Sequence, residues 1–332
     1  MPGANQLSAE LGVNHKTAEA ALCQLEREGV LAGQGAGRRR RVVPPTELQL
    51  RTSLRIAILL LDPADRKAEI QGELRYHLHK AGHVVFYPRK SVSELGGSLR
   101  RLSRMVKQSD ADAWVVVAGS REVLAWFEAQ GLPVFALAGR YQGLPVPSIG
   151  PNKLPAMRRA VRKLVKLGHR RIVLLCRTVR RVPVPGVFER EFLQELESHG
   201  ITPSSFNLPE WREDAAGLHA SLEGLFRVTP PTAVFLDEAV FVASFLQFCA
   251  RRRLGVPTDV SLLCNDPDPS FSWFQDSVAH IGVDHRPIVR RIERWARNVS
   301  HGRRDLRQSL TEAKLISGGT IGPVPACPHQ RD

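Results

Sequence analysis

The stretch VKLGHRRIVLL (residues 165–175) contains the change of pattern that decides the fold. Its first residues finish a helix that begins after Asn152, which we expect to cap it, and that carries apolar side chains at intervals of three and four with basic ones opposite. Gly168 ends the helix, and Ile172–Cys176 then forms a short apolar run. A helix that leads into a fully apolar strand is typical of a parallel sheet covered on both faces.

Further apolar runs of strand length alternate with helical patterns along most of the chain, so we predict an α/β fold. One of these helices carries Phe188, Phe192 and Leu196 on a single side and ends at Gly200. The number of strands is too large for one small sheet and predicts two α/β lobes of similar size. The remaining expected strands are Ile56–Leu61, Val84–Tyr87, Trp114–Ala118, Val134–Ala138, Ala233–Leu236, Val260–Cys264 and His280–Val283.

Composition and charge narrow the class of protein. The chain has 332 residues, 43% of them hydrophobic, which suits two or three folded domains and excludes a disordered chain. Lysine and arginine exceed aspartate and glutamate by 47 − 33 = 14, which favours a polyanion such as nucleic acid as one partner.

The sequence shows no membrane or signal segment and no cysteine motif. The chain has no run of about 18 apolar residues and no apolar signal segment after Met1, so we expect a cytoplasmic protein without membrane contact. Its five cysteines are scattered without CxxC spacing, so we expect reduced and mostly buried thiols. No cofactor is indicated.

The segment QLSAELGVNHKTAEAALCQLEREG (residues 6–29) has the punctuation of a helix-turn-helix. It predicts a short helix, a turn at Gly12 and a second helix that Asn14 caps. The start of such a helix is the part that enters a major groove. We expect the buried side of the second helix to consist of Ala18, Ala21, Leu22 and Leu25.

The next segment, VLAGQGAGRRRRVV (residues 30–43), predicts a strand, a glycine turn and a basic strand, which together form a β-hairpin wing. Its arginines could meet phosphates or reach a minor groove. These glycines do not form a dinucleotide-binding loop, because such a loop follows a strand and begins a helix, whereas here arginines and valines follow. A solvated basic turn beside a plain helical hairpin is the remaining alternative.

Residues 7–43 resemble the winged helix of the GntR family, in which a helix-turn-helix is followed by a glycine-rich, basic wing. The resemblance implies a further helix ahead of Gln6, so we expect either a start farther upstream or a unit stabilised in another way. Asn14 and His15 stand where the family usually has serine and arginine, which leaves the sequence preference open. The implied DNA-binding residues are Asn14, His15, Lys16, Thr17, Gly35, Gly37, Arg38, Arg39, Arg40 and Arg41.

The larger part of the chain resembles the sensor domains of LacI/GalR-type regulators, which look like periplasmic sugar-binding proteins. The resemblance rests on the opening stretch, on PTAVF (residues 231–235) and on GVPTDVSLLCND (residues 255–266), in family order. It implies a two-lobed, type I periplasmic-binding-protein-like domain whose ligand cleft lies at the carboxyl ends of the strands.

Candidate cleft residues can be chosen by their position in this fold. Each could instead be a helix cap or part of a surface ion pair. They are Asp62, Arg140, Asp237, Glu238 and Asp266. Phe188 stands where the family often carries a ligand-clamping arginine, and Asp237-Glu238 replaces its Asn-Asp pair. A sugar or related metabolite, a different effector, and a cleft turned to protein interaction therefore all remain open.

Two further clusters of charged residues bear on what the chain could bind. Residues 153–181 hold eleven lysines and arginines and no acid, which could add DNA affinity, accept an anionic effector or form a solvated helix face. His280, Asp284 and His285 lie close together but lack a second ligand cluster, so we expect no metal site.

The sequence therefore predicts a winged helix-turn-helix over residues 1–43, a linker over 44–54, a LacI-like sensor over 55–320 and a tail over 321–332. We expect a homodimeric transcription regulator that binds double-stranded DNA and responds to a small-molecule effector. An α/β enzyme is the main alternative, but GxSxG, GxxxxGK[ST] and HExxH are absent. The second alternative is a solute-binding protein that has no role in DNA binding.

Overall fold

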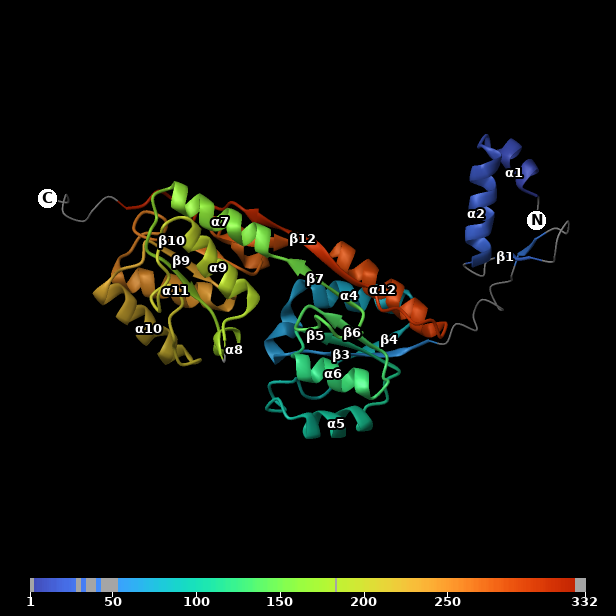
Figure 1. Ribbon diagram of the computed structural model, residues 1–332, viewed down its shortest axis with the longest axis horizontal. Coiled ribbons are helices and arrows are strands. Elements are labelled where there is room, and N and C mark those ends of the chain that lie inside the picture. The colour runs from blue at the N-terminus through green and yellow to red at the C-terminus, as the bar shows by residue number, and fades with distance from the viewer. Residues whose placement is uncertain (1–2, 28–30, 34–39, 43–52, 183, 326–332) are drawn as a thin grey trace.

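The computed structural model describes residues 3–27, 31–33, 40–42, 53–182 and 184–325. Figure 1 shows a small N-terminal unit and a larger body built of two lobes. In the body, a mostly parallel sheet in each lobe is covered by helices on both faces. The α/β prediction is thus confirmed for the larger part of the chain.

The N-terminal unit consists of α1 (Ala4–Leu11), α2 (His15–Arg27), β1 (Leu31–Ala32) and β2 (Arg41–Val42). Gly12 makes the turn between the helices with φ of +64°, and the Asn14 side chain accepts a hydrogen bond from the Lys16 N–H at 2.9 Å. The two strands pair antiparallel. Leu22 packs with Ala4 and Leu31, but Ala21 is exposed, so its place on the buried side was predicted wrongly.

The first lobe has the strand order β4-β3-β5-β6-β7, all parallel. Its strands are β3 (Arg55–Leu59), β4 (Val84–Phe86), β5 (Ala113–Val117), β6 (Val134–Leu137) and β7 (Ser148–Asn152). Helices α4 (Glu69–Lys80) and α12 (Arg286–Ser300) cover one face, and α5 (Leu99–Gln108) and α6 (Arg121–Ala129) cover the other. A short 3-10 helix, η1 (Pro63–Lys67), follows β3.

The second lobe has the order β11-β10-β9-β8, again parallel. Its strands are β8 (Ile172–Leu175), β9 (Ala233–Leu236), β10 (Ser261–Cys264) and β11 (Ala279–Val283). Helices α7 (Leu154–Lys166) and α9 (Val187–Ser198) cover one face, and α10 (Ala215–Val228) and α11 (Val240–Arg252) cover the other. Short turns of helix, α8 (Thr178–Arg181) and η2 (Pro269–Trp273), follow β8 and β10.

Strand β12 (Gln308–Ile316) belongs to both lobes. Its first five residues, Gln308–Glu312, pair in parallel with β7 of the first lobe. Its last four, Ala313–Ile316, pair antiparallel with β11 of the second lobe. One continuous strand therefore joins the two sheets, and Figure 1 shows it running between them.

All of the apolar runs assigned from the sequence are strands, whereas β7 and β12 were not assigned. Asn152 does not cap α7 as expected, because it is the last residue of β7 and Lys153 precedes the helix without a side-chain cap. The expected tail begins with residues that pack on the second lobe. Buried His169 contacts the Gly322 carbonyl at 2.9 Å, and the Val324 N–H donates to the Leu167 carbonyl.

Four of the cysteines lie in described parts of the chain and are free thiols. Cys23 is half-buried, and Cys176, Cys249 and Cys264 are buried, while Cys327 lies outside the described residues. None of the described helices is both long and apolar enough to cross a membrane.

Replacing Gly139 by alanine should destabilise the first lobe strongly. A Cβ there would lie 2.5 Å from the Gly119 carbonyl oxygen, and the residue has φ of +91°. We expect a loss of about 3–4 kcal/mol in the free energy of unfolding by urea. Gly131→Ala is the matched control, since φ is +66° and nothing lies within 4 Å of its Cβ. That variant should lose only about 1–2 kcal/mol, and equal losses would contradict the close approach.

Candidate functional site

The carboxyl ends of β8, β9 and β10 gather charged residues of the second lobe. The three strands are parallel neighbours in register, so the loops that follow them leave the same edge of the sheet. The residues that follow the strands are Arg177 and Arg180 after β8, Asp237 and Glu238 after β9, and Asn265 and Asp266 after β10. Three of the acids predicted from the sequence are thus brought together.

Asp237 is buried at this edge and forms an ion pair with Arg180, whose side chain is 41% exposed. Arg180 Nη2 lies 2.9 Å from Asp237 Oδ1, and its Nε lies 3.1 Å from Oδ2. Asn265 Nδ2 also donates to Asp237 Oδ1, at 3.0 Å. Burial alone would raise the pKa of Asp237, whose side chain is only 3% exposed, but Arg180 and Asn265 hold that pKa below its ordinary value. The carboxylate therefore remains ionised while Arg180 is in place.

The two other acids are paired as well. Arg177 donates from Nε and Nη2 to the Glu238 carboxylate at 2.6 and 2.8 Å, and burial raises the pKa of Glu238. Lys153, next to the start of α7, contacts Asp266 Oδ1 at 2.5 Å and donates to the Asn265 carbonyl at 2.9 Å. Each acid predicted for the second lobe is therefore neutralised by a cation of the same lobe.

The first lobe contributes charges that act across to this cluster. Asp62 follows β3, caps η1 by accepting from the Ala64 N–H at 3.0 Å, and is near Asp65. Burial raises the pKa of Asp65, and the charges of Asp62, Arg177 and Asp266 act on it too. The two lobes thus face each other within electrostatic range.

Arg140 is the other residue predicted in the first lobe. It is exposed after β6. Burial raises the pKa of Glu189, a residue of α9 in the second lobe, and the charge of Arg140 opposes that rise weakly. This long-range effect places Arg140 on the side that faces the second lobe. The structure thus brings Asp237, Glu238 and Asp266 together and places Asp62 within electrostatic range of them, whereas Arg140 makes only a long-range contribution.

Two buried acceptors of this region make no hydrogen bond within the described residues. They are Glu189 Oε1 and Asn265 Oδ1. Glu189 is 1% exposed, and its Oε1 lies 3.5 Å from Arg180 Nε, which is an ion-pair distance too long for a good hydrogen bond. A buried acceptor without a donor is costly. A ligand with hydroxyl or amino groups could supply both donors.

The sequence reasoning missed Lys153, Arg177 and Arg180, although it noticed the basic run in which they lie. In the structure, the basic residues of this run fall into two groups that pair with different acids. Arg158 and Arg162 on α7 pair with Glu191 and Glu195 on α9, the second pair at 2.7 Å. The three missed residues turn instead to the strand ends. The signal that could have separated them is position, because Arg177 and Arg180 follow a strand directly.

The N-terminal unit presents part of the predicted DNA-binding set. Asn14, His15, Lys16 and Thr17 are all exposed at the start of α2. Arg40 is committed elsewhere, because its guanidinium contacts Glu19 at 3.0 Å and Glu26 at 2.9 Å and its side chain is only 21% exposed. Arg41 lies in β2. The predicted residues Gly35, Gly37, Arg38 and Arg39 lie outside the described residues.

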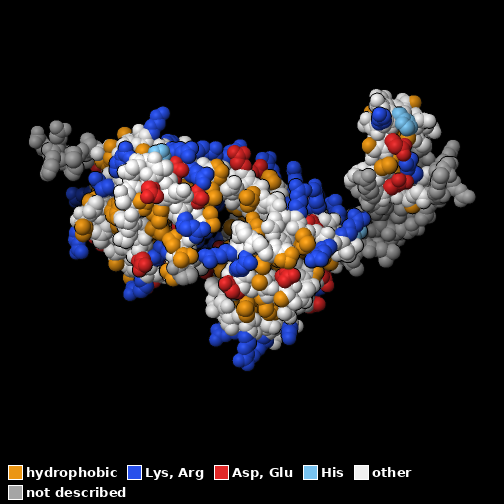
Figure 2. Space-filling model, in the orientation of Figure 1, with side chains coloured by type: hydrophobic (Ala, Val, Ile, Leu, Met, Phe, Trp, Pro, Cys, Tyr) orange, Lys and Arg blue, Asp and Glu red, His pale blue; other side chains and the backbone are white. Residues whose placement is uncertain are grey.

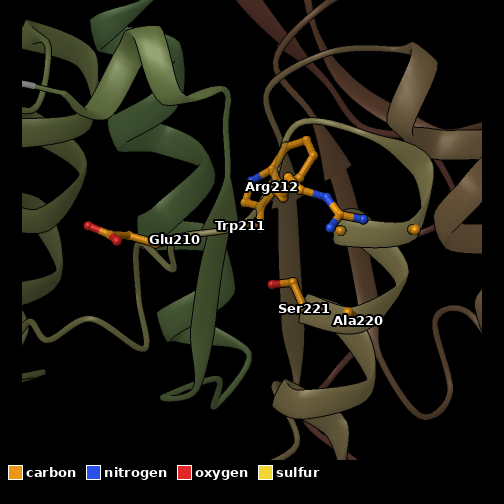
Figure 3. Close-up of a pocket in the computed structure, with 7 residues that line it drawn as sticks. Glu210, Trp211, Arg212, Ala220 and Ser221 are labelled. Atoms are coloured by element: carbon orange, nitrogen blue, oxygen red, sulfur yellow. The ribbon is translucent and has the colours of Figure 1, made fainter.

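A separate depression of about 380 Å³ lies on the surface of the second lobe. Figure 3 shows Trp211 and Arg212 beside the first turns of α10, with Ala220 and Ser221 on the helix. None of the predicted cleft residues lines this depression.

Asp284 pairs with Arg286 at 2.9 Å, and the described residues hold no group of three or more histidines, cysteines or acids that could bind a metal.

Comparison with known proteins agrees with this architecture. The sequence profile of the periplasmic binding protein-like domain matches residues 161–321. The HTH-type transcriptional regulator RafR of Escherichia coli is 31% identical over 167 residues, which is 48% of this chain and 48% of that protein. The chain thus matches about half the length of this curated relative.

Two solved structures show the same fold at low sequence identity. A LacI family transcriptional regulator from Enterococcus faecium with bound ribose has a TM-score of 0.67 at 14% identity, and covers 81% of this chain and 99% of its own. The lac repressor dimer bound to operator and the anti-inducer ONPF has a TM-score of 0.65 at 18% identity, and covers 85% of this chain and 100% of its own.

The body is therefore a type I periplasmic-binding-protein-like domain of the kind found in LacI-family regulators. The type I sensor fold predicted from the sequence is confirmed. The regulators in this comparison are LacI-type, so it does not show the GntR type that we assigned to the N-terminal unit from the sequence.

Replacing Arg180 by methionine should leave the Asp237 carboxylate buried without its cation. We expect a loss of about 3–5 kcal/mol in the free energy of unfolding at pH 7. The pKa of Asp237 should then rise, so that the folded variant binds a proton and its deficit against the wild type narrows between pH 7 and pH 5. In the wild type the pKa is depressed, so stability from this pair is lost only as the pH falls below about 4.

Arg177→Met is the matched control, because its partner Glu238 has a side chain that is 30% exposed. Its deficit should be no more than about 1 kcal/mol. Urea unfolding of both variants at the two pH values makes the comparison. Equal deficits, or a deficit of Arg180→Met that widens at pH 5, would contradict the assignment.

Proposed function

We propose that this chain is a DNA-binding transcription regulator whose operator affinity is set by a small molecule held between the two lobes of its sensor domain. The observation that carries the proposal is the cluster of charged groups that both lobes direct at one region while sharing β12. A change in the angle between the lobes changes that region and the body to which the helix-turn-helix is attached. Binding and DNA affinity can therefore be coupled.

The DNA-binding part of the proposal rests on α2. Its first turn exposes a cation, an imidazole and two short polar side chains, which are the groups that contact phosphates and base edges. The antiparallel pair β1 and β2 after α2 fits a wing of the GntR type, which is the finer assignment that we propose for this unit. Arg40 would then support the hairpin by holding it to α2, while other arginines of the run meet the phosphates.

The effector part rests on the hydrogen-bonding character of the cleft. Glu189 Oε1 and Asn265 Oδ1 need donors, and the neighbouring carboxylates can accept further hydrogen bonds. Polyols present many such donors, and ribose is bound by one structure of the same fold. We therefore propose a sugar or a related hydroxylated metabolite as the effector class.

An enzyme fits this region less well. The carboxylates are tied into ion pairs, and burial raises the pKa values of the nearby Cys176 and Cys264 thiols, which disfavours the thiolate. The cleft groups are therefore suited to holding a ligand and not to activating a nucleophile. A homodimer in the cytoplasm, with one helix-turn-helix on each half-site, completes the proposal.

The DNA contact can be tested with Lys16. Full-length protein would first select a site from random duplex DNA. Lys16→Gln should weaken binding to all duplexes alike and reduce the slope of log affinity against log salt by about one phosphate contact, or about 0.9. Lys166→Gln, which changes another exposed lysine, on α7, should leave the slope unchanged. Equal slopes for all three proteins would remove Lys16 from the contact, and a wild type that selects no duplex would overturn the regulator.

The effector site can be tested with two glutamates that are each paired with an arginine. A thermal-shift screen with pentoses, hexoses and their acids should find a compound that raises Tm and changes operator affinity at least fivefold. Glu238→Gln should abolish that response. Glu223→Gln, which breaks the exposed pair with Arg252 on α10 and α11, should keep it. A response that survives in the first variant would place the effector elsewhere.

A further inference from the structure

Helix α12 carries a stripe of basic side chains on the face that it turns to solvent. Its four exposed arginines are spaced four, four and three residues apart, which puts them on one side of the helix. They are Arg286, Arg290, Arg294 and Arg297. The opposite side is fixed in the core of the first lobe by Ile292 and Trp295. The stripe therefore cannot turn inward.

Most of this positive charge is not neutralised by neighbouring acids. Arg286 pairs with Asp284, and Glu293 pairs with His77 of α4 at 3.1 Å. Within the described parts of the chain, Arg290, Arg294 and Arg297 are exposed and form no ion pair. Three guanidinium groups on one helix face are thus available to an anionic partner.

The stripe ends where the sensor body begins. The Leu54 N–H lies 3.3 Å from His83 Nδ1, and the Ser53 hydroxyl donates to the Gly82 carbonyl at 2.6 Å. Burial lowers the pKa of His83, and the charge of Arg297 lowers it further, so Arg297 lies close to this junction. The C-terminal end of the stripe is therefore next to the point where the chain leaves for the N-terminal unit.

Other exposed cations extend the stripe around the same end of the lobe. Together we name them the junction-side basic surface, which consists of Arg290, Arg294, Arg297, Arg303, Arg304 and Lys80. Figure 2 shows lysine and arginine side chains gathered over this part of the first lobe. The surface lies at the carboxyl ends of α4 and α12, where the helix dipoles favour cations.

The reach of the connecting chain limits how far DNA can lie from this surface. Ten residues, 43–52, separate β2 from Ser53. Even fully extended they span at most about 36 Å, which is close to one turn of a DNA duplex. The linker therefore keeps β2 within about one helical turn of the junction, and β2 belongs to the same small unit as α2.

We propose that the junction-side basic surface is a second DNA-contacting surface, which holds the phosphate backbone beside the site that α2 reads. The proposal rests on the DNA-binding function proposed above. Such contacts carry no sequence information, but they add affinity and salt dependence. They also make affinity depend on how the first lobe is placed, because the contacts lie on the sensor body itself.

The test compares two triple variants of the full-length protein. Arg290, Arg294 and Arg297 are replaced by glutamine in one, and Arg100, Arg101 and Arg104 in the other. The control arginines are also exposed, on α5, which covers the opposite face of the same sheet. Binding is measured against salt on a selected duplex with about one helical turn of flanking DNA on each side, and on the same duplex without flanks.

On the flanked duplex the α12 variant should lose about two to three units of salt slope and at least tenfold in affinity, whereas the α5 variant should match the wild type. On the trimmed duplex all three proteins should bind alike. Equal slopes for all proteins on flanked DNA would overturn the second surface while leaving the regulator intact. A wild type that binds neither duplex would overturn both. Unchanged urea unfolding of the variants separates these outcomes from misfolding.

Discussion

The sharing of β12 between the two sheets is the constraint on which the rest of the structure depends. Its first half is hydrogen-bonded to β7 and its second half to β11, with the change between Glu312 and Ala313. A strand held at both ends can bend or twist there but cannot separate. The loop that leads from α12 into β12 is also fixed. Buried Arg291 on α12 contacts Asp305 at 2.9 Å and donates to the Arg307 carbonyl at 2.7 Å. Movement of the lobes is thereby restricted to a change of angle.

That restriction bears on the charged groups of the two lobes that act on each other across the region between them. Arg177 is the example: it donates to Glu238 of its own lobe, and the charge of Asp62 in the first lobe acts on it at longer range. A ligand that enters must either insert between these charges or replace one partner of a pair. Its binding energy then depends on the angle between the lobes, which is the difference between states that an allosteric effector requires.

The sequence predicted those parts of the fold whose residues are buried on both sides. Runs such as Ala233–Leu236 have no polar residue because both faces of the strand are covered, and they were assigned with nearly correct bounds. Strand β7 contains Gly150 and Pro151, and β12 is largely exposed along one side, so neither has the apolar run that marks a buried strand. Both lie where the lobes meet, and that position follows only from the assembled sheets.

The sequence pointed to the acidic residues of the site but not to the cations that pair with them. Asp237, Glu238 and Asp266 were predicted from their places in the LacI-like segments. The cations that neutralise them come from a run in which helix-face and strand-end arginines look alike. The same limitation applies to Arg40, which stands in a row of four arginines and yet holds the hairpin to α2. Charge counted along a sequence therefore overstates the charge that is available to DNA. Cations can contribute to DNA binding only where the fold leaves them without an acid and near the duplex, which is the arrangement that we propose for α12.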